Sequence, residues 1–144
     1  MKTLVTNSVE ETEQVAAAFA KTLHAPAVVA YFGGLGMGKT AFTRGLAKGL
    51  GIDAEVSSPT FALVHAYEGR DVTLYHYDMY RVETWEDLET TGFFDDFARG
   101  GILAVEWSEN IENALPEGSI RVTIAPGETD TQRVITIENG DNEA

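Results

Sequence analysis

The chain has 144 residues, 44% of them hydrophobic and 23% charged, which is typical of a globular protein and fits a single domain over 1–144, with 141–144 as a disordered tail. Its formal net charge of −13 would repel nucleic-acid phosphates over most of the surface, so direct binding to RNA or DNA is not expected. The sequence has no cysteine, no basic-then-apolar leader and no apolar run of the roughly 18 residues that a membrane span needs, which predicts a cytoplasmic protein.

The first half of the chain alternates between helical and strand patterns. Ser8 and Glu11 have the spacing of a capping box and predict an amphipathic helix over 8–23. The apolar run 27–32 predicts a strand that is buried on both faces. Apolar residues at spacings of four predict a second helix over 39–50, which ends before a glycine.

The second half contains more strands. Residues 61–80 split around a glycine-containing turn and predict a hairpin, while 85–100 predicts a short helical segment interrupted at Gly92. Residues 101–107 predict another buried strand. Two alternating runs near the end of the chain, 119–125 and 132–138, predict an antiparallel pair.

A cluster of glycines between the first buried strand and the second helix carries the clearest functional motif. Gly33, Gly38, Lys39 and Thr40 match the phosphate-binding loop pattern G-x-x-x-x-G-K-[ST], in which backbone N–H groups surround the phosphates, the lysine supplies charge and the hydroxyl reaches Mg²⁺. The alternative is a flexible glycine turn before a helix. The residues predicted to contact the nucleotide here are Gly33, Gly34, Leu35, Gly36, Met37, Gly38, Lys39, Thr40 and Ala41.

This motif and its flanking elements predict the fold class. We expect an α/β protein of the P-loop NTPase type, a three-layer sandwich with a mixed, partly parallel central sheet. Three of the ten basic residues, Lys39, Arg44 and Lys48, fall in one ten-residue window, which suggests a small anionic ligand.

Two acidic residues end strand-like runs and are candidates for the Mg²⁺ site. In open α/β sheets ligands gather at the carboxyl ends of strands, where both Glu106 and Asp78 are expected. We assign Glu106 to the metal, together with Thr40, and Asp78 to orienting the attacking water. The alternative for each acid is the cap of a neighbouring helix.

Other polar and aromatic residues leave alternatives open. Ser58 or Thr60 in the segment 57–61 would sense a γ-phosphate, or the segment is a simple turn. His76 shares a strand face with Asp78 and is either functional or a core histidine. Trp107 either stacks on the nucleotide base or packs against the protein.

The choice of nucleotide and reaction follows from what the sequence lacks. A guanine-reading N-K-x-D pattern is absent, which argues against a GTPase. Kinases of this class usually need several lid arginines, and few arginines lie between the second helix and the last strands. ATP hydrolysis is therefore preferred to phosphoryl transfer.

Four blocks in this order, "GGLGMGKT" at 33–40, "SSPTF" at 57–61, "HYDMYR" at 76–81 and "VEW" at 105–107, resemble the bacterial TsaE family of ATPases. The resemblance implies an accessory role in threonylcarbamoyladenosine modification of tRNA. Partners of the TsaD and TsaB type would carry out the transfer and hold the tRNA, and hydrolysis of ATP would reset their complex.

The resemblance also implies roles for single residues. Lys39 would hold phosphate, Thr40 and Glu106 would reach Mg²⁺, and Thr60 and Asp78 would lie in switch-like loops near the γ-phosphate. Lys39, Thr60 and Asp78 are therefore the predicted catalytic residues. The family loop usually reads G-D-L-G-A-G-K-T, and here Gly34 and Met37 replace its acid and its alanine.

Two other functions remain as alternatives. A small-molecule P-loop kinase would consume ATP in proportion to a phosphate acceptor. A nucleotide-gated binding module would bind ATP without useful turnover.

Overall fold

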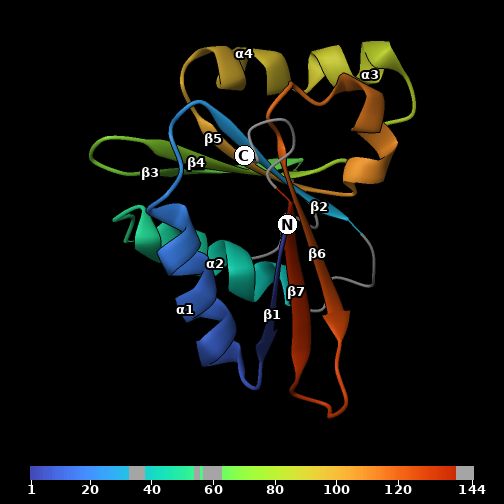
Figure 1. Ribbon diagram of the computed structural model, residues 1–144. Coiled ribbons are helices and arrows are strands. Elements are labelled where there is room, and N and C mark those ends of the chain that lie inside the picture. Colours follow the sequence, from blue (N-terminus) through green and yellow to red (C-terminus); the bar gives the residue numbers. More distant parts are fainter. Residues whose placement is uncertain (33–37, 54–55, 57–62, 139–144) are drawn as a thin grey trace.

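The computed structural model describes residues 1–32, 38–53, 56 and 63–138 (Figure 1). In this part of the chain one seven-stranded sheet has the order β1-β7-β6-β2-β5-β4-β3. Its strands are β1 (Lys2–Thr6), β2 (Ala27–Phe32), β3 (Val64–Glu68), β4 (Thr73–Asp78), β5 (Ile102–Glu106), β6 (Ile120–Pro126) and β7 (Arg133–Glu138). The helices are α1 (Val9–Ala20), α2 (Lys39–Gly49), α3 (Trp85–Thr90), α4 (Phe93–Ala98) and the 3₁₀ segment η1 (Ser108–Ala114).

The centre of the sheet is parallel and its margins are antiparallel. Strand β2 pairs in parallel with β5 and β6, and β5 pairs in parallel with β4. The pairs β3–β4, β6–β7 and β1–β7 are antiparallel. The carboxyl ends of β2, β5 and β4 therefore lie next to one another at one edge of the sheet.

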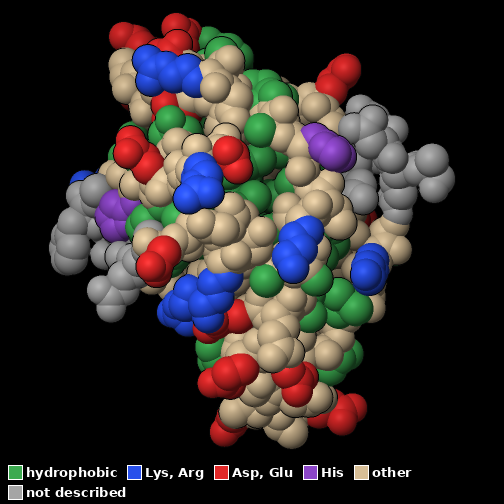
Figure 2. All heavy atoms as spheres, turned by 90° about the vertical axis from the view of Figure 1, so that its left-hand side faces the viewer, with side chains coloured by type: hydrophobic (Ala, Val, Ile, Leu, Met, Phe, Trp, Pro, Cys, Tyr) green, Lys and Arg blue, Asp and Glu red, His purple; other side chains and the backbone are tan. Residues whose placement is uncertain are grey.

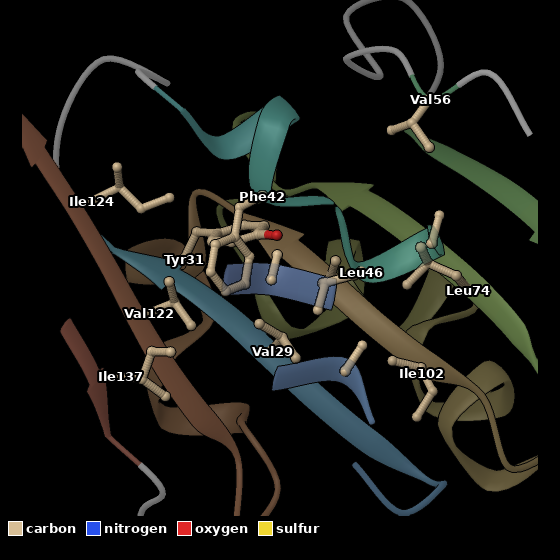
Figure 3. Close-up of a cluster of buried hydrophobic side chains, with 14 of the residues drawn as sticks. Val29, Tyr31, Phe42, Leu46, Val56, Leu74, Ile102, Val122, Ile124 and Ile137 are labelled. Carbon is tan, nitrogen blue, oxygen red and sulfur yellow. The ribbon is translucent and has the colours of Figure 1, made fainter. Parts of the chain in front are cut away.

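Helices cover both faces of this sheet, as Figure 1 shows. Helices α1 and α2 lie on one face, where a buried cluster includes Val29, Phe42 and Leu46 (Figure 3). The other face carries a second cluster, built around Tyr77, Phe93 and neighbouring residues under α3, α4 and η1. The predicted α/β class, with three layers and a mixed, partly parallel sheet, is confirmed.

Helices α1 and α2 approach each other unusually closely. A Cβ atom added at Gly45 would lie 2.3 Å from the carbonyl oxygen of Glu13, and one at Gly49 would lie 2.3 Å from that of Ala17. These two glycines of α2 therefore serve helix packing. Gly45 and Gly49 are therefore explained by the packing of α2 against α1 and not by the phosphate-binding motif.

Charged side chains reinforce the same helix pair. Glu13 of α1 accepts hydrogen bonds from Arg44 at 2.9 Å and from Lys48 at 2.5 Å, both on α2. Two of the three basic residues in the predicted anion-binding window are thus engaged with a carboxylate of the protein. Figure 2 shows acidic and basic side chains interspersed on the face that it displays.

The predicted elements are confirmed with shifted ends. Ser8 caps α1 by accepting from the Glu11 N–H at 3.1 Å, but the helix ends at Ala20, three residues before its predicted end. The hairpin, the helical segment broken at Gly92, the buried strand β5 and the terminal antiparallel pair are all present. Strand β1 and the η1 segment were not predicted.

None of the helices in the described part of the chain has both the length and the apolar character that crossing a bilayer requires.

Candidate nucleotide-binding site

Helix α2 begins at the edge of the sheet where the central strands end. Its N-terminal cap is Gly38, which has φ +84°, and a Cβ there would come within 3.1 Å of the Ile124 side chain. Both the left-handed backbone and the close approach favour glycine at this position. The next residue, Lys39, is 4% exposed and Thr40 is half-buried. The N-terminal end of an 11-residue helix, which carries a partial positive charge, therefore meets the sheet edge.

A short hydrogen-bond chain fixes the first turn of α2 against β2. The Thr43 hydroxyl donates to the Lys39 carbonyl at 2.8 Å, so it accepts from the Tyr31 hydroxyl, which lies 2.7 Å away. Figure 3 shows the Tyr31 ring beside Phe42, both within the core. These two hydrogen bonds hold the backbone of Lys39 in place relative to the central strand β2.

The pKa of the Tyr31 hydroxyl is raised above its ordinary value, chiefly because the side chain is buried. The hydrogen bond with Thr43 opposes this shift, and the charge of Glu106 adds to it. The carboxylate of Glu106 is therefore close enough to Tyr31 to act on it electrostatically.

The alternation of side chains along the strands brings the predicted acids to the α2 side of the sheet. Leu74 and Ile102 belong to the cluster under α1 and α2, so His76 and Asp78 on β4 and Glu106 on β5 share that face. In the parallel register Asp78 lies beside Glu106. Two carboxylates on neighbouring strands, about 4.8 Å apart at the backbone, would repel each other, and a bound cation would relieve that repulsion.

Glu106 is almost completely buried, with 8% of its surface exposed. Its Oε2 lies 2.6 Å from Nε2 of His76, which is itself fully buried on β4. The strand partner of His76 is Ala104, a small residue that leaves room for the imidazole to reach along the face to Glu106. The sequence predicted that His76 shares a strand face with Asp78, and the structure shows that His76 contacts Glu106.

The segments that follow β4 and β5 are tied together. The Asp78 Oδ1 accepts the Tyr80 N–H at 2.9 Å, and the Met79 N–H donates to the Glu106 carbonyl at 3.0 Å. The Asn110 side-chain amide donates to the carbonyls of Met79 at 2.8 Å and Tyr80 at 3.1 Å. Asp78 and Glu106 therefore belong to one connected unit.

Trp107 follows Glu106 directly and adopts an uncommon backbone. Its φ of 60° makes it the single non-glycine residue with a positive φ among the described residues. The ring lies 4.8 Å from that of Tyr80 and remains 39% exposed. Such strain is often retained at functional sites, and here it occurs beside a buried acid.

Among the described residues, the predicted nucleotide contacts Gly38, Lys39, Thr40 and Ala41 lie at the start of α2. Asp78, Glu106 and Trp107 lie at the carboxyl ends of β4 and β5, on the edge of the sheet from which α2 begins. The predicted contacts Gly33, Gly34, Leu35, Gly36 and Met37, and the predicted catalytic Thr60 with Ser58, lie outside the described residues. Within the described part of the chain no three His, Asp or Glu side chains form a metal cluster. The oxygen atoms that Thr40, Asp78 and Glu106 offer fit Mg²⁺, because this ion commonly takes one or two carboxylates and completes its coordination shell with substrate phosphates and water.

Sequence reasoning missed a hollow of about 400 Å³ beside the start of α2. It is lined by Ser8, Val9, Glu10, Thr12, Gly38, Ala41, Arg44, Asp130, Thr131 and Arg133. Residues from the start of α1 and from the β6–β7 turn form its walls together with the start of α2. The order of the strands in the sheet brings these three segments together. No local pattern in the sequence indicates it, because its walls come from segments that are far apart along the chain.

Comparison with known proteins shows which family the sequence matches. The family model described as "Threonylcarbamoyl adenosine biosynthesis protein TsaE" matches residues 6–135. A tRNA threonylcarbamoyladenosine biosynthesis protein TsaE of Treponema pallidum is 38% identical over 83% of this chain and 88% of its own length. The protein of that name from Bacillus subtilis is 39% identical over 87% of this chain and 78% of its own length.

A solved structure agrees with the sequence matches. The crystal structure of Bacillus subtilis YdiB superimposes with a TM-score of 0.79 and 32% identity, over 98% of this chain and 86% of that one. The resemblance seen in the four sequence blocks is confirmed. The chain belongs to the TsaE family of tRNA threonylcarbamoyladenosine biosynthesis proteins.

Proposed function

We propose that the chain binds Mg·ATP at the edge formed by the start of α2 and the ends of β4 and β5, and hydrolyses it in support of tRNA threonylcarbamoyladenosine modification. The observation that carries the proposal is the convergence of a buried lysine at a glycine-capped helix N-terminus with two adjacent strand-end carboxylates. We further propose that hydrolysis resets a threonylcarbamoyl-transferase complex of TsaD and TsaB type proteins in the cytoplasm, and that those partners hold the tRNA.

Each residue has a distinct proposed task. The backbone of 33–38 surrounds the phosphates, and Lys39 balances their charge. The Thr40 hydroxyl and the Glu106 carboxylate hold Mg²⁺, which when bound neutralises charge on the phosphate oxygens. Asp78 orients the attacking water, and Thr60 contacts the γ-phosphate.

The first test measures nucleotide binding by calorimetry with and without Mg²⁺. Lys39→Ala should weaken ATP binding by roughly tenfold or more, because charged hydrogen bonds to phosphate are lost. Glu106→Gln should abolish the gain in affinity that Mg²⁺ provides, whereas Asp78→Asn should retain most of it. Asp71→Asn, an exposed acid in the β3–β4 turn, is the control and should bind like wild type. The reverse ranking of the two site acids would refute their assignment.

Phosphate release separates this proposal from the two alternatives. Slow release by the chain alone and faster release after addition of the partner proteins would support the ATPase role. Consumption of ATP only in proportion to a phosphorylated small molecule would indicate a kinase. A binding module would retain cellular function in Asp78→Asn as long as ATP still bound.

The hollow beside Gly38 is a second candidate for the nucleotide base, in addition to Trp107. It adjoins the helix end where the phosphates would lie, and its lining includes the apolar Val9 and Ala41. We therefore propose that the base occupies the hollow. Val9→Glu should weaken ATP binding more than Trp107→Phe does, as measured by calorimetry. Stronger loss in Trp107→Phe would assign the base to the tryptophan instead.

A further inference from the structure

His76 is a buried polar residue that is not explained by the core around it. Its side chain has no exposed surface and lies on the same face of β4 as the apolar Leu74. The ring makes one hydrogen bond, from Nε2 to Oε2 of Glu106. Its other nitrogen, Nδ1, has no hydrogen-bond partner in the described part of the chain.

The chemistry of the imidazole and the carboxylate gives the direction of the hydrogen bond between His76 and Glu106. A carboxylate that receives Mg²⁺ offers only acceptor oxygens, so the imidazole donates from Nε2 to Oε2 of Glu106, which lies 2.6 Å away. Nδ1 is buried without a hydrogen-bond partner in the described part of the chain, which costs free energy on folding. The hydrogen bond to Glu106 is therefore the one polar contact of this buried ring in the described part of the chain.

The contact restricts how Glu106 can turn. With Oε2 engaged by a buried ring, the carboxylate has one preferred rotation, and no residue in the described part of the chain forms a hydrogen bond with Oε1. Asp78 is oriented differently, by the backbone N–H of Tyr80. The two adjacent acids therefore have independent supports, one from a side chain and one from the backbone.

We propose that His76 is a positioning residue, which holds the Glu106 carboxylate in the orientation that receives Mg²⁺ with the bound nucleotide. The inference rests on the proposed function, since it assumes that Glu106 is a metal ligand. Partners that orient a metal ligand typically change metal affinity 10- to 100-fold when they are removed.

Two amide variants test the direction of the hydrogen bond. The amide nitrogen of glutamine extends about as far from the backbone as Nε2 of histidine, whereas that of asparagine extends only as far as Nδ1. His76→Gln should therefore keep the Mg²⁺-dependent gain in ATP affinity, and His76→Asn should lose it by about tenfold or more. The readout is the ratio of dissociation constants without and with Mg²⁺, measured by calorimetry on the full chain.

A double variant shows whether His76 acts through Glu106. Glu106→Gln already lacks the Mg²⁺ gain, so the quantity compared here is the dissociation constant for ATP in the presence of Mg²⁺. If His76 acts through Glu106, adding His76→Asn to the Glu106→Gln variant should leave that constant unchanged. Tyr77→Phe is the matched control. Tyr77 follows His76 on β4 and points to the opposite face of the sheet, where its buried hydroxyl donates to Asp96 of α4. That variant should keep the wild-type Mg²⁺ ratio.

The outcomes are distinguishable. A normal Mg²⁺ ratio in His76→Asn, or losses that add in the double variant, would overturn the positioning role. Equal losses in the two amide variants would also overturn it, because reach to Glu106 would not matter. Absence of any Mg²⁺ effect in the wild-type chain would instead remove the proposed function, and this inference with it. Thermal unfolding of each variant without nucleotide identifies one that does not fold.

Discussion

Glu13 shows at the scale of one residue how charge supports the fold. The hydrogen bond from Lys48 holds the pKa of Glu13 below its ordinary value of 4.5; partial burial opposes this shift, and Arg44 reinforces it. A lowered pKa means that the folded state favours the ionised form. Both basic partners are substantially exposed, with 37% and 63% of their side-chain surface accessible, so the gain is modest.

Glu13→Gln should therefore lower the free energy of unfolding by about 0.5–1 kcal/mol at pH 7. Because the folded pKa is depressed, this contribution is complete above about pH 4.5 and disappears as the pH falls through the folded value. Urea unfolding of both proteins between pH 7 and pH 3 measures the difference. A difference that persists unchanged at pH 3 would show that packing rather than charge is lost.

The candidate site could be predicted from the sequence only in part. The phosphate loop, Asp78 and Glu106 could be proposed as site residues because a glycine motif and strand-end acids are local patterns. The contact between His76 and Glu106 could not be predicted, because the two residues are 30 positions apart and meet only through the register of β4 and β5. The roles of Arg44 and Lys48 were missed because Glu13, on another helix, neutralises them.

At the scale of elements, the close contact of α1 and α2 depends on small residues. A Cβ at Gly45 would lie 2.3 Å from a backbone oxygen and 2.6 Å from the Cβ of Ala16. Overpacking should cost about 1–3 kcal/mol and the better helix propensity of alanine should return about 1 kcal/mol, so Gly45→Ala should destabilise the protein by up to about 2 kcal/mol. The midpoint of urea unfolding measures the effect.

A substitution on the exposed side of α1 provides the control for this prediction. Gln14→Ala changes helix propensity without touching α2, and it should shift stability by less than about 0.5 kcal/mol. If Gly45→Ala instead stabilised the protein, the two helices would be able to move apart at little cost.

Elements with a strong local pattern were predicted, and those defined by tertiary contact were not. The capping box of α3, with Thr84 and Asp87 bonded reciprocally, is visible in the sequence and present in the structure. Strand β1 is a short edge strand, mostly exposed, and its pairing with β7 supplies its order. The η1 segment contains a kink at Ile111 and has no regular period to detect.

The whole molecule combines a parallel centre with antiparallel margins, and this order could not be read from the sequence. Alternating strands and helices predicted the class, but β6 joins β2 while its hairpin partner β7 extends the sheet to β1. That order places the β6–β7 turn beside the start of α2. The hollow proposed for the base is thus a product of long-range topology.

The antiparallel pairing of β1 with β7 has a consequence for engineering the chain. Lys2 is paired with Ile137, so the start of the first strand lies beside the end of the last strand along the chain. A short peptide linker would join them, and new termini could then be opened in the exposed β3–β4 turn, remote from the strand ends that carry Asp78 and Glu106. Such a circular permutant would place both termini, and any tag fused to them, at the opposite end of β4 from Asp78.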